Sequence, residues 1–271
     1  MKIFAIRDET DSRQKNLAYL LYYEIEKQFY IELPDRADPW ATPLLLSSFA
    51  QKGETTVNSY WSKIWVQQRI LPADRQNIGQ VLRENNLKSY DEYSLLMLSM
   101  GRCAQDDYYL VSINENELPK TISKRFMRKI DDIIPLEDYT LLVFFHDGTI
   151  KRNSLKTYFE ENPQFSILLK RENLFSSVRV QAGGYGVSWD VNLNISNKVL
   201  YKTGKTIPIT TSEFITFAVQ GVVNSIEAAD LLGCSRQNID DLTKRGKLCP
   251  IKMSGKNTLY LKAEILKRLW Q

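Results

Sequence analysis

The side chains best suited to nucleophilic, acid–base or metal chemistry are few in this chain and are not grouped. His146 is the only histidine, so a Ser-His-Asp or Cys-His arrangement would have to use it. It precedes Asp147-Gly148 between two apolar runs, a pattern typical of a β-hairpin turn. The three cysteines are scattered, and no spacing typical of a zinc or calcium site occurs. We therefore expect no enzyme, no metal and no cofactor.

A different chemistry, the reading of DNA bases, is favoured near the C-terminus. In the stretch EAADLLGCSRQNIDDLTKRGKL (227–248), Arg236, Gln237 and Asn238 follow Ser235, a good N-cap residue. On a helix that enters the major groove, Gln and Asn suit adenine and Arg suits guanine. We predict that these four residues contact nucleic acid.

Behind this stretch lies a basic segment that favours phosphate contacts. From Thr243 to Ala263 the sequence contains six lysines and arginines and no acid. Such side chains would neutralise phosphates and give a salt-dependent affinity. Asp240 and Asp241 count against this interpretation, because their charge would face phosphates unless they turn outward. The basic residues that we predict to contact DNA are Lys244, Arg245, Lys247, Lys252 and Lys256.

The surrounding residues predict the elements that hold this candidate reader. Ser225 is expected to cap a first helix, and Gly233 to end it in the left-handed conformation. Pro250 blocks a helix, and residues 254–257 predict a turn between two short strands before a last helix. Helix, turn, helix, basic hairpin, helix is the order of a small winged helix-turn-helix. It resembles the DNA-binding domains of excisionases and MerR-type regulators, which implies a DNA-binding domain at 212–271.

The middle of the chain, residues 128–208, predicts a small α+β module. Two apolar runs flank the His-Asp-Gly turn, helical stretches follow, and strands near 175–181 and 186–190 are joined through glycines. The segments DYTLLVFFHDGTIKRNSLKTYF and LFSSVRVQAGGYGVSWD resemble a bacterial domain of unknown function, the DUF 2442 family. The resemblance implies a fold and a bacterial source rather than an activity. That domain occurs beside helix-turn-helix and toxin–antitoxin components.

The N-terminal region, residues 1–118, predicts another α+β module. Strands are expected at 17–26 and 27–34, helices follow, and YYLVSI at 108–113 predicts a strand. The segment 114–127 has few apolar anchors and many charges, so we predict a linker there.

The order of these elements resembles the N-terminal subdomain of HipA-type toxin kinases. The catalytic and magnesium-binding acids of that family's kinase core do not follow, so the resemblance implies only the non-catalytic subdomain. The family's Pro-Glu-Gly is replaced by Pro72-Ala73-Asp74, and its closing Gly-Ala by Ala104-Gln105-Asp106. The matching positions are Trp40, Pro43, Leu44, Leu46, Leu71, Pro72, Leu95, Leu96, Gly101 and Cys103.

Several other polar or aromatic groups have simple structural explanations. The pairs Asp106-Asp107 and Asp131-Asp132 lie beside predicted strands or linkers, where solvated faces explain them. Trp61 and Trp65 share a helical face and favour core packing over base stacking. Four arginines would suit an anionic partner, although surface solubility explains them equally well. They are Arg69, Arg75, Arg83 and Arg102.

Charge is distributed unevenly along the chain. The net charge of +4 divides into 13 Lys/Arg against 17 Asp/Glu over 1–118, 14 against 9 over 119–211, and 9 against 6 over 212–271. An acidic N-terminal part and a basic C-terminal part suggest protein contacts at the N-terminal end and nucleic-acid contacts at the C-terminal end. No apolar run approaches the roughly 20 residues that span a bilayer. We expect a cytoplasmic protein without a membrane partner.

These observations predict a multidomain α+β protein, with two small α+β modules followed by a winged helix-turn-helix domain. We expect a non-enzymatic bacterial DNA-binding regulatory protein with an antitoxin-like or autoregulatory role. Its expected partners are double-stranded DNA and a protein, either a toxin or a second copy in a homodimer. No small-molecule ligand is identifiable. Two alternatives stay open: an interaction or antitoxin module without specific DNA binding, and an unrecognised enzyme in residues 1–118, which predicts a deep polar pocket.

Overall fold

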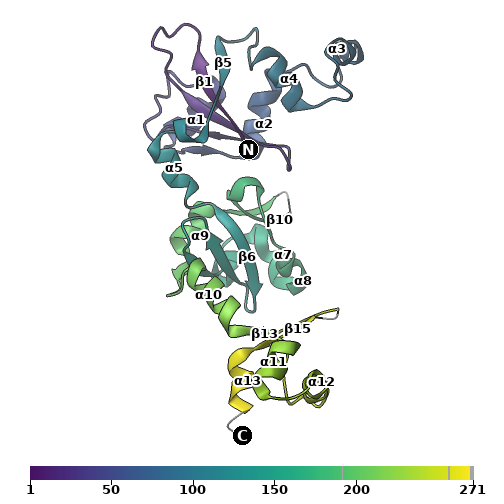
Figure 1. Ribbon diagram of the computed structural model, residues 1–271. Coiled ribbons are helices and arrows are strands. Elements are labelled where there is room, and N and C mark those ends of the chain that lie inside the picture. The colour runs from purple at the N-terminus through teal and green to yellow at the C-terminus, as the bar shows by residue number, and fades with distance from the viewer. Residues whose placement is uncertain (191, 256, 269–271) are drawn as a thin grey trace. The chain divides into compact units, whose positions relative to one another are not determined.

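The computed structural model describes residues 1–190, 192–255 and 257–268 (Figure 1). The chain divides into two compact units, each built from two stretches of sequence. Unit 1 comprises Met1–Ile130 and Val178–Lys198, and unit 2 comprises Asp131–Ser177 and Val199–Gln271. Both combine helices with small antiparallel sheets, which confirms the α+β class. The boundaries of the three expected modules stay a prediction.

A five-stranded antiparallel sheet forms the centre of unit 1, in the order β4-β3-β2-β1-β5. The predicted hairpin and the predicted strand at 108–113 are confirmed, with Tyr23 opposite Gln28 at the hairpin end. The strand β1, which pairs with both β2 and β5, was not expected from the sequence. The strands are β1 (Lys2–Asp8), β2 (Ala18–Tyr23), β3 (Gln28–Glu32), β4 (Thr56–Val57) and β5 (Tyr108–Ile113).

Helices cover both faces of this sheet. On one face, Trp65 and Leu96 pack with Phe4, Leu20 and Ile31 in a buried cluster. The helices on this side are α1 (Leu44–Gln51), α2 (Ser59–Gln67) and α4 (Glu92–Ser99), and the short α3 (Ile78–Glu84) contains no fully buried residue. The preference of Trp65 for the core is confirmed, whereas Trp61 is 41% exposed.

The expected linker at 114–127 is wrong. It folds as η1 (Glu115–Glu117) and α5 (Lys120–Phe126). Ile122 and Phe126 pack against Ile3 and Leu21 on the second face of the sheet. Two apolar side chains four residues apart lie on one face of a helix. These two side chains are therefore enough to hold α5 against the apolar face of the sheet.

Residues 178–198 form a three-stranded sheet in the order β11-β10-β9 and belong to unit 1. The rings of Tyr30 and Tyr185 stack with centroids 4.0 Å apart, which fastens this sheet to β3. Gly184 has φ +72, and a Cβ there would lie 2.4 Å from the carbonyl oxygen of Ile130. The strands are β9 (Arg179–Val180), β10 (Gly186–Asp190) and β11 (Leu193–Ser196).

The first part of unit 2 contains a sheet of order β12-β8-β7-β6. The predicted hairpin around His146 is confirmed, because β7 and β8 pair and Gly148 has φ +81 between them. The strands are β6 (Ile130–Leu136), β7 (Thr140–Phe145), β8 (Ile150–Ser154) and β12 (Lys205–Thr206). The helices are α6 (Lys156–Glu161), α7 (Ser166–Lys170), α8 (Glu172–Ser176) and α9 (Asn197–Thr203).

The last part of unit 2 has its own small core. The sheet β13-β15-β14 packs with two helices around Ala228, Ile239, Leu248 and Tyr260. Its elements are α10 (Thr211–Gly221), β13 (Val222–Asn224), α11 (Ser225–Leu232), α12 (Arg236–Lys244), β14 (Lys252–Ser254), β15 (Asn257–Leu261) and α13 (Lys262–Lys267). None of the helices in the described parts of the chain has the length and apolar character needed to cross a membrane.

Candidate nucleic-acid interface

The helix α11 begins one residue earlier than the sequence suggested. Asn224, rather than Ser225, is the N-cap: its side chain accepts hydrogen bonds from the backbone N–H groups of Ile226 (2.8 Å) and Glu227 (3.0 Å). Glu227 in turn accepts from the N–H of Asn224 at 2.8 Å, which completes a capping box. Ser225 is instead buried. Both residue types cap well, and the extended backbone of β13 reaches Asn224 and so decides between them.

The turn into α12 is the one that the sequence predicted. Gly233 has φ +62 and ψ +34 and ends α11. Ser235 then caps α12, its hydroxyl accepting from the N–H of Asn238 at 3.3 Å. Helix α12 therefore starts at Arg236, and the predicted base-reading residues form its first turn.

The faces of α12 are clearly separated. Ile239 is fully buried in the core, with Leu242 partly buried beside it. The side chains of Arg236, Gln237 and Asn238 are exposed on the other faces of the first turn. Exposure at the start of a helix whose opposite side is anchored is what insertion of the helix N-terminus into a groove requires.

A direct contact between side chains fixes α12 relative to the hairpin that follows it. Tyr260 on β15 is 1% exposed, and its hydroxyl lies 2.9 Å from that of Thr243 on α12. Strands β14 and β15 pair from Lys252 opposite Leu259 to Ser254 opposite Asn257. The helix and the hairpin therefore form one surface within this part of unit 2.

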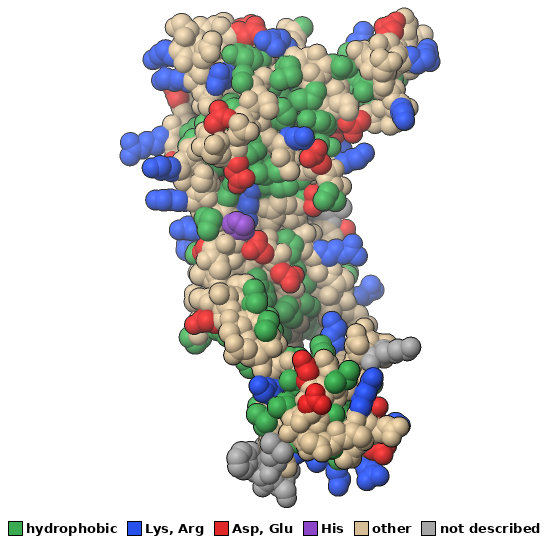
Figure 2. Space-filling view, viewed as in Figure 1, with side chains coloured by type: hydrophobic (Ala, Val, Ile, Leu, Met, Phe, Trp, Pro, Cys, Tyr) green, Lys and Arg blue, Asp and Glu red, His purple; other side chains and the backbone are tan. Residues whose placement is uncertain are grey.

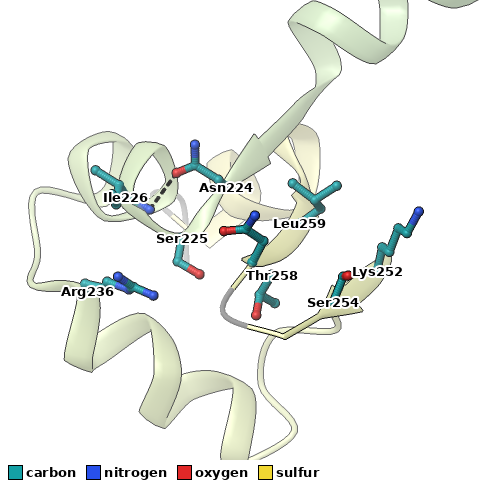
Figure 3. A pocket seen from close by; sticks show the side chains of 9 residues that line it. Asn224, Ser225, Ile226, Arg236, Lys252, Ser254, Thr258 and Leu259 are labelled. Atoms are coloured by element: carbon teal, nitrogen blue, oxygen red, sulfur yellow. Dashed lines mark hydrogen bonds between the residues drawn. The ribbon is translucent and has the colours of Figure 1, made fainter.

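Between the hairpin and the first turns of α11 and α12 lies an open cavity of about 530 Å³. Figure 3 shows Arg236 reaching from α12 towards Ser225, with Ser254 and Thr258 on the hairpin side. The lining combines hydroxyl, amide and basic side chains and includes Lys252. The lining also includes the apolar side chains of Ile226 and Leu259, so this surface offers hydrogen-bond donors to an anion beside an apolar contact.

The predicted phosphate-binding residues are exposed where the structure describes them. Lys244 is the last residue of α12, Arg245 and Lys247 follow it, and Lys252 lies on β14. Lys256 lies outside the described residues. On the face seen in Figure 2, this part of the molecule carries both Lys and Arg side chains and some Asp and Glu side chains.

Two acidic residues also lie on α12. Asp240 is half-buried and Asp241 is exposed. Residues four apart share a helix face, so Asp241 lies on the same outward face as Gln237. It would therefore be close to base edges in any groove that Gln237 reaches, where a carboxylate suits the amino group of cytosine and opposes phosphate.

His146, the residue considered for catalysis, lies beside a carboxylate on β6. The Nδ1 atom of His146 lies 3.2 Å from an oxygen of Asp131, and both side chains are more than half exposed. The described residues contain no cluster of three His, Cys, Asp or Glu side chains suited to a metal ion. The cysteines Cys103, Cys234 and Cys249 are free thiols.

One carboxylate and one arginine differ from the expectation of a solvated surface. Arg69 is 6% exposed. Its Nη2 atom lies 2.6 Å from an oxygen of Asp106, and its guanidinium lies 3.9 Å from the ring centroid of Trp65. Arg69 and Asp106 therefore hold the loop before β5 against α2.

A cluster of buried charges in unit 1 was missed by sequence reasoning. Glu32 is 1% exposed, and an oxygen of its carboxylate lies 3.1 Å from Nη2 of Arg125. Burial raises the pKa of Glu32, with Arg125 opposing the shift. Lys129 donates to the hydroxyl of Tyr23 at 2.8 Å, and burial lowers the pKa of Lys129 to about 7. No local signal identifies this cluster, because Tyr23 and Glu32 come from β2 and β3 whereas Arg125 and Lys129 lie about 100 positions further along the chain.

Comparison with known families identifies one part of the chain. Residues 130–206 match the family described as "Protein of unknown function (DUF2442)", which confirms the resemblance predicted for the middle module. No curated protein and no solved structure matches this chain. The resemblances of the N-terminal region and of residues 212–271 stay predictions.

Proposed function

We propose that this protein is a DNA-binding regulator whose residues 212–271 act as a winged helix-turn-helix. Helix α12 would enter the major groove with Arg236, Gln237 and Asn238 towards base edges. The lysines after α12 and on β14 would contact phosphates. The observation that carries the proposal is the exposed first turn of α12, held by the Thr243–Tyr260 contact beside a hairpin that has no acidic residue.

The wider role proposed for the chain is regulatory, either antitoxin-like or autoregulatory. Residues 1–208 would provide contacts to a protein partner, which would be a toxin or a second copy of the chain. Helix-turn-helix readers commonly bind as two-fold dimers, because their operators tend to be palindromic. No catalytic step, metal or cofactor enters this proposal.

The test is a genome-wide capture of bound DNA fragments with the full-length protein and with the double variant Arg236→Ala/Gln237→Ala. We expect defined sites for the wild type and their loss in the variant, because both side chains are exposed and their removal leaves the core intact. Lys202→Ala, an exposed lysine on α9, is the control and should retain the sites. An unchanged or featureless profile would exclude base reading by α12.

A second candidate function, protein interaction without specific DNA binding, is favoured by the surface of α10. Ile215 (56%), Phe217 (51%) and Val219 (75%) are exposed on this helix, although apolar side chains usually avoid water. This alternative predicts DNA binding that is equally weak for every sequence and is lost near physiological salt. Fluorescence anisotropy with unrelated duplexes over a salt series separates the two functions.

A further inference from the structure

Unit 1 contains a cavity that no motif in the sequence indicated. Its volume is about 440 Å³, within the range typical of small-molecule sites. One wall is formed by the region from α1 to the start of α2, which contributes Phe49, Thr56 and Tyr60. The other wall is formed by residues 181–198, which contribute Tyr185 and Lys198. Both walls belong to the same compact unit.

The apolar part of the lining is aromatic. Tyr30 and Tyr185 are stacked and buried, so they give the cavity a rigid floor. Tyr60 is 66% exposed, with its ring centroid 5.2 Å from that of Trp61. Aromatic side chains prefer stacked or edge contacts with other rings. A ligand with a flat ring therefore suits this wall.

The polar part of the lining includes a single lysine. The Nζ atom of Lys198 donates to the hydroxyl of Thr55 at 3.1 Å, and burial lowers the pKa of Lys198. Lys198 is an exposed residue, and an ammonium group that donates to a neutral hydroxyl retains capacity for an anion. Ser59 and Tyr60, in the first turn of α2, also face the cavity, and N–H groups at a helix start favour negative charge.

Two further groups restrict what can bind. The hydroxyl of Tyr185 is enclosed and interacts with the side chains of Glu32 and Tyr23, so it is not available to a ligand. The amide side chains of Asn58 and Gln181 line the cavity. The oxygen of Asn58 already accepts from the N–H of Trp61 at 3.1 Å, so Gln181 offers the paired donor and acceptor. Glu54 also lines it and is exposed, so an anionic group must lie on the Lys198 side.

We propose that this cavity binds a nucleoside monophosphate, with its phosphate at Lys198 and its base against the aromatic wall. A flat base with a hydrogen-bonding edge matches the aromatic and amide lining, and the phosphate matches the lysine. A purely apolar ligand would leave the Lys198 ammonium desolvated without compensation. This site lies in unit 1 and does not depend on the proposed DNA contacts of residues 212–271.

The test is isothermal titration of the full-length protein with AMP, GMP, CMP and UMP, and with adenosine and inorganic phosphate as partial ligands. At least one nucleotide should bind with a Kd below about 1 mM, and the partial ligands should bind at least about tenfold more weakly, because each satisfies one part of the site. Binding of none of the four nucleotides below that concentration would overturn the proposal.

Three variants locate the site. Lys198→Met keeps the apolar stem and should weaken nucleotide binding at least about tenfold. Lys202→Met, at an exposed lysine one turn further along α9 that does not line the cavity, should not. Tyr60→Ala removes an exposed side chain and should also weaken nucleotide binding. If thermal melting shows that Lys198→Met is unfolded, Tyr60→Ala alone tests whether the nucleotide binds in this cavity. Wild-type affinity in both Lys198→Met and Tyr60→Ala would overturn the proposal.

The double variant Arg236→Ala/Gln237→Ala separates this proposal from DNA binding. It should bind the nucleotide as the wild type does, while losing DNA sites. Loss of nucleotide binding in this variant would place the nucleotide on α12 and would overturn the cavity proposal.

Discussion

The charged side chains compared in the two units differ in their exposure to water. In unit 1, Glu32 and Arg125 are withdrawn from water and face each other across 3.1 Å. In unit 2, Lys244, Arg245 and Lys252 extend into solvent from α12 and β14. A buried charge needs a partner to offset its desolvation, whereas an exposed charge retains its hydration and can exchange it for a ligand.

The comparison shows why the charge of a segment is a weak guide to its function. Residues 119–130 are rich in Lys and Arg, as is the segment after α12. Arg125 and Lys129, however, pair with Glu32 and Tyr23 inside unit 1. What separates the two segments is the apolar pair Ile122 and Phe126, which draws α5 onto the sheet. Charge therefore indicates an interface only where the apolar residues of the segment leave it on the surface.

The largest effect is expected when the buried pair loses one partner. Arg125→Met should lower the free energy of unfolding of unit 1 by about 3 kcal/mol or more, because Glu32 is left buried without its partner. Urea denaturation followed by tryptophan fluorescence suits this measurement, since Trp40, Trp61, Trp65 and Trp189 all lie in unit 1.

The matched control for this variant is Arg102→Met. Arg102 pairs with Glu9 at 2.6 Å, but both side chains are about half exposed. An exposed ion pair contributes at most about 1 kcal/mol, so the control should be nearly as stable as the wild type. Equal losses in the two variants would show that the Glu32–Arg125 pair is not buried as described.

The next effect in size distinguishes the glycines of the two units. Gly184→Ala should destabilise unit 1 by more than about 2 kcal/mol, because a left-handed residue costs roughly 1–2 kcal/mol and its Cβ would also meet the backbone of Ile130 at 2.4 Å. Gly233→Ala, in the turn before α12, has φ +62 but nothing within 4 Å of its Cβ. This variant should lose only the roughly 1–2 kcal/mol that a non-glycine residue costs in the left-handed conformation. Thermal unfolding of both variants measures the difference, and equal costs would exclude close packing of Gly184 against Ile130.

A smaller effect is expected from pH, through Lys129. Its pKa is lowered to about 7 by burial, against about 10.4 in the unfolded chain. Between these values the unfolded state binds one more proton, so the free energy of unfolding should rise with pH, by at most about 1.4 kcal/mol per unit. Below pH 7 both states are protonated and this contribution does not vary.

Urea denaturation at pH 7, 8 and 9 measures this slope and stays below the range in which unfolded tyrosines ionise. Lys129→Met removes the titrating group, so most of the rise should disappear in that variant. Lys124→Met, an exposed lysine on α5, should keep the wild-type slope. A slope that is the same in all three proteins would mean that Lys129 is not desolvated.

Much of the fold could be predicted because its signals are local. The His146-Asp147-Gly148 turn, the stop at Gly233 and the cap at Ser235 each depend on a few adjacent residues. The same holds for the hairpin of β2 and β3. Local rules do not decide between two neighbours that suit the same position, as with Asn224 and Ser225 at the start of α11.

What could not be predicted depends on residues far apart in the chain. Arg125 donates to the backbone oxygen of Leu33, 92 positions away, and no periodicity in either segment indicates that contact. Residues 181–198 meet residues 30–60 only after folding, so the cavity at Lys198 has no sequence signature. Strand β1 was not predicted because its short apolar run is followed at once by charged residues. Its pairing with β2 and β5 is what makes it a strand, and the sequence does not show that pairing.

The smallest effect on stability, and the most informative for function, is expected on the basic surface of unit 2. Lys244→Ala and Lys252→Ala should each change the free energy of unfolding by less than about 0.5 kcal/mol, since both side chains are exposed. Under the proposed function, each should weaken binding to every duplex alike and reduce the slope of log K against log salt by about 1. Fluorescence anisotropy at several salt concentrations measures that slope. A variant with unchanged stability and an unchanged slope would show that its lysine does not contact phosphate, whereas Arg236→Ala should alter the preference among sequences without a comparable change in slope.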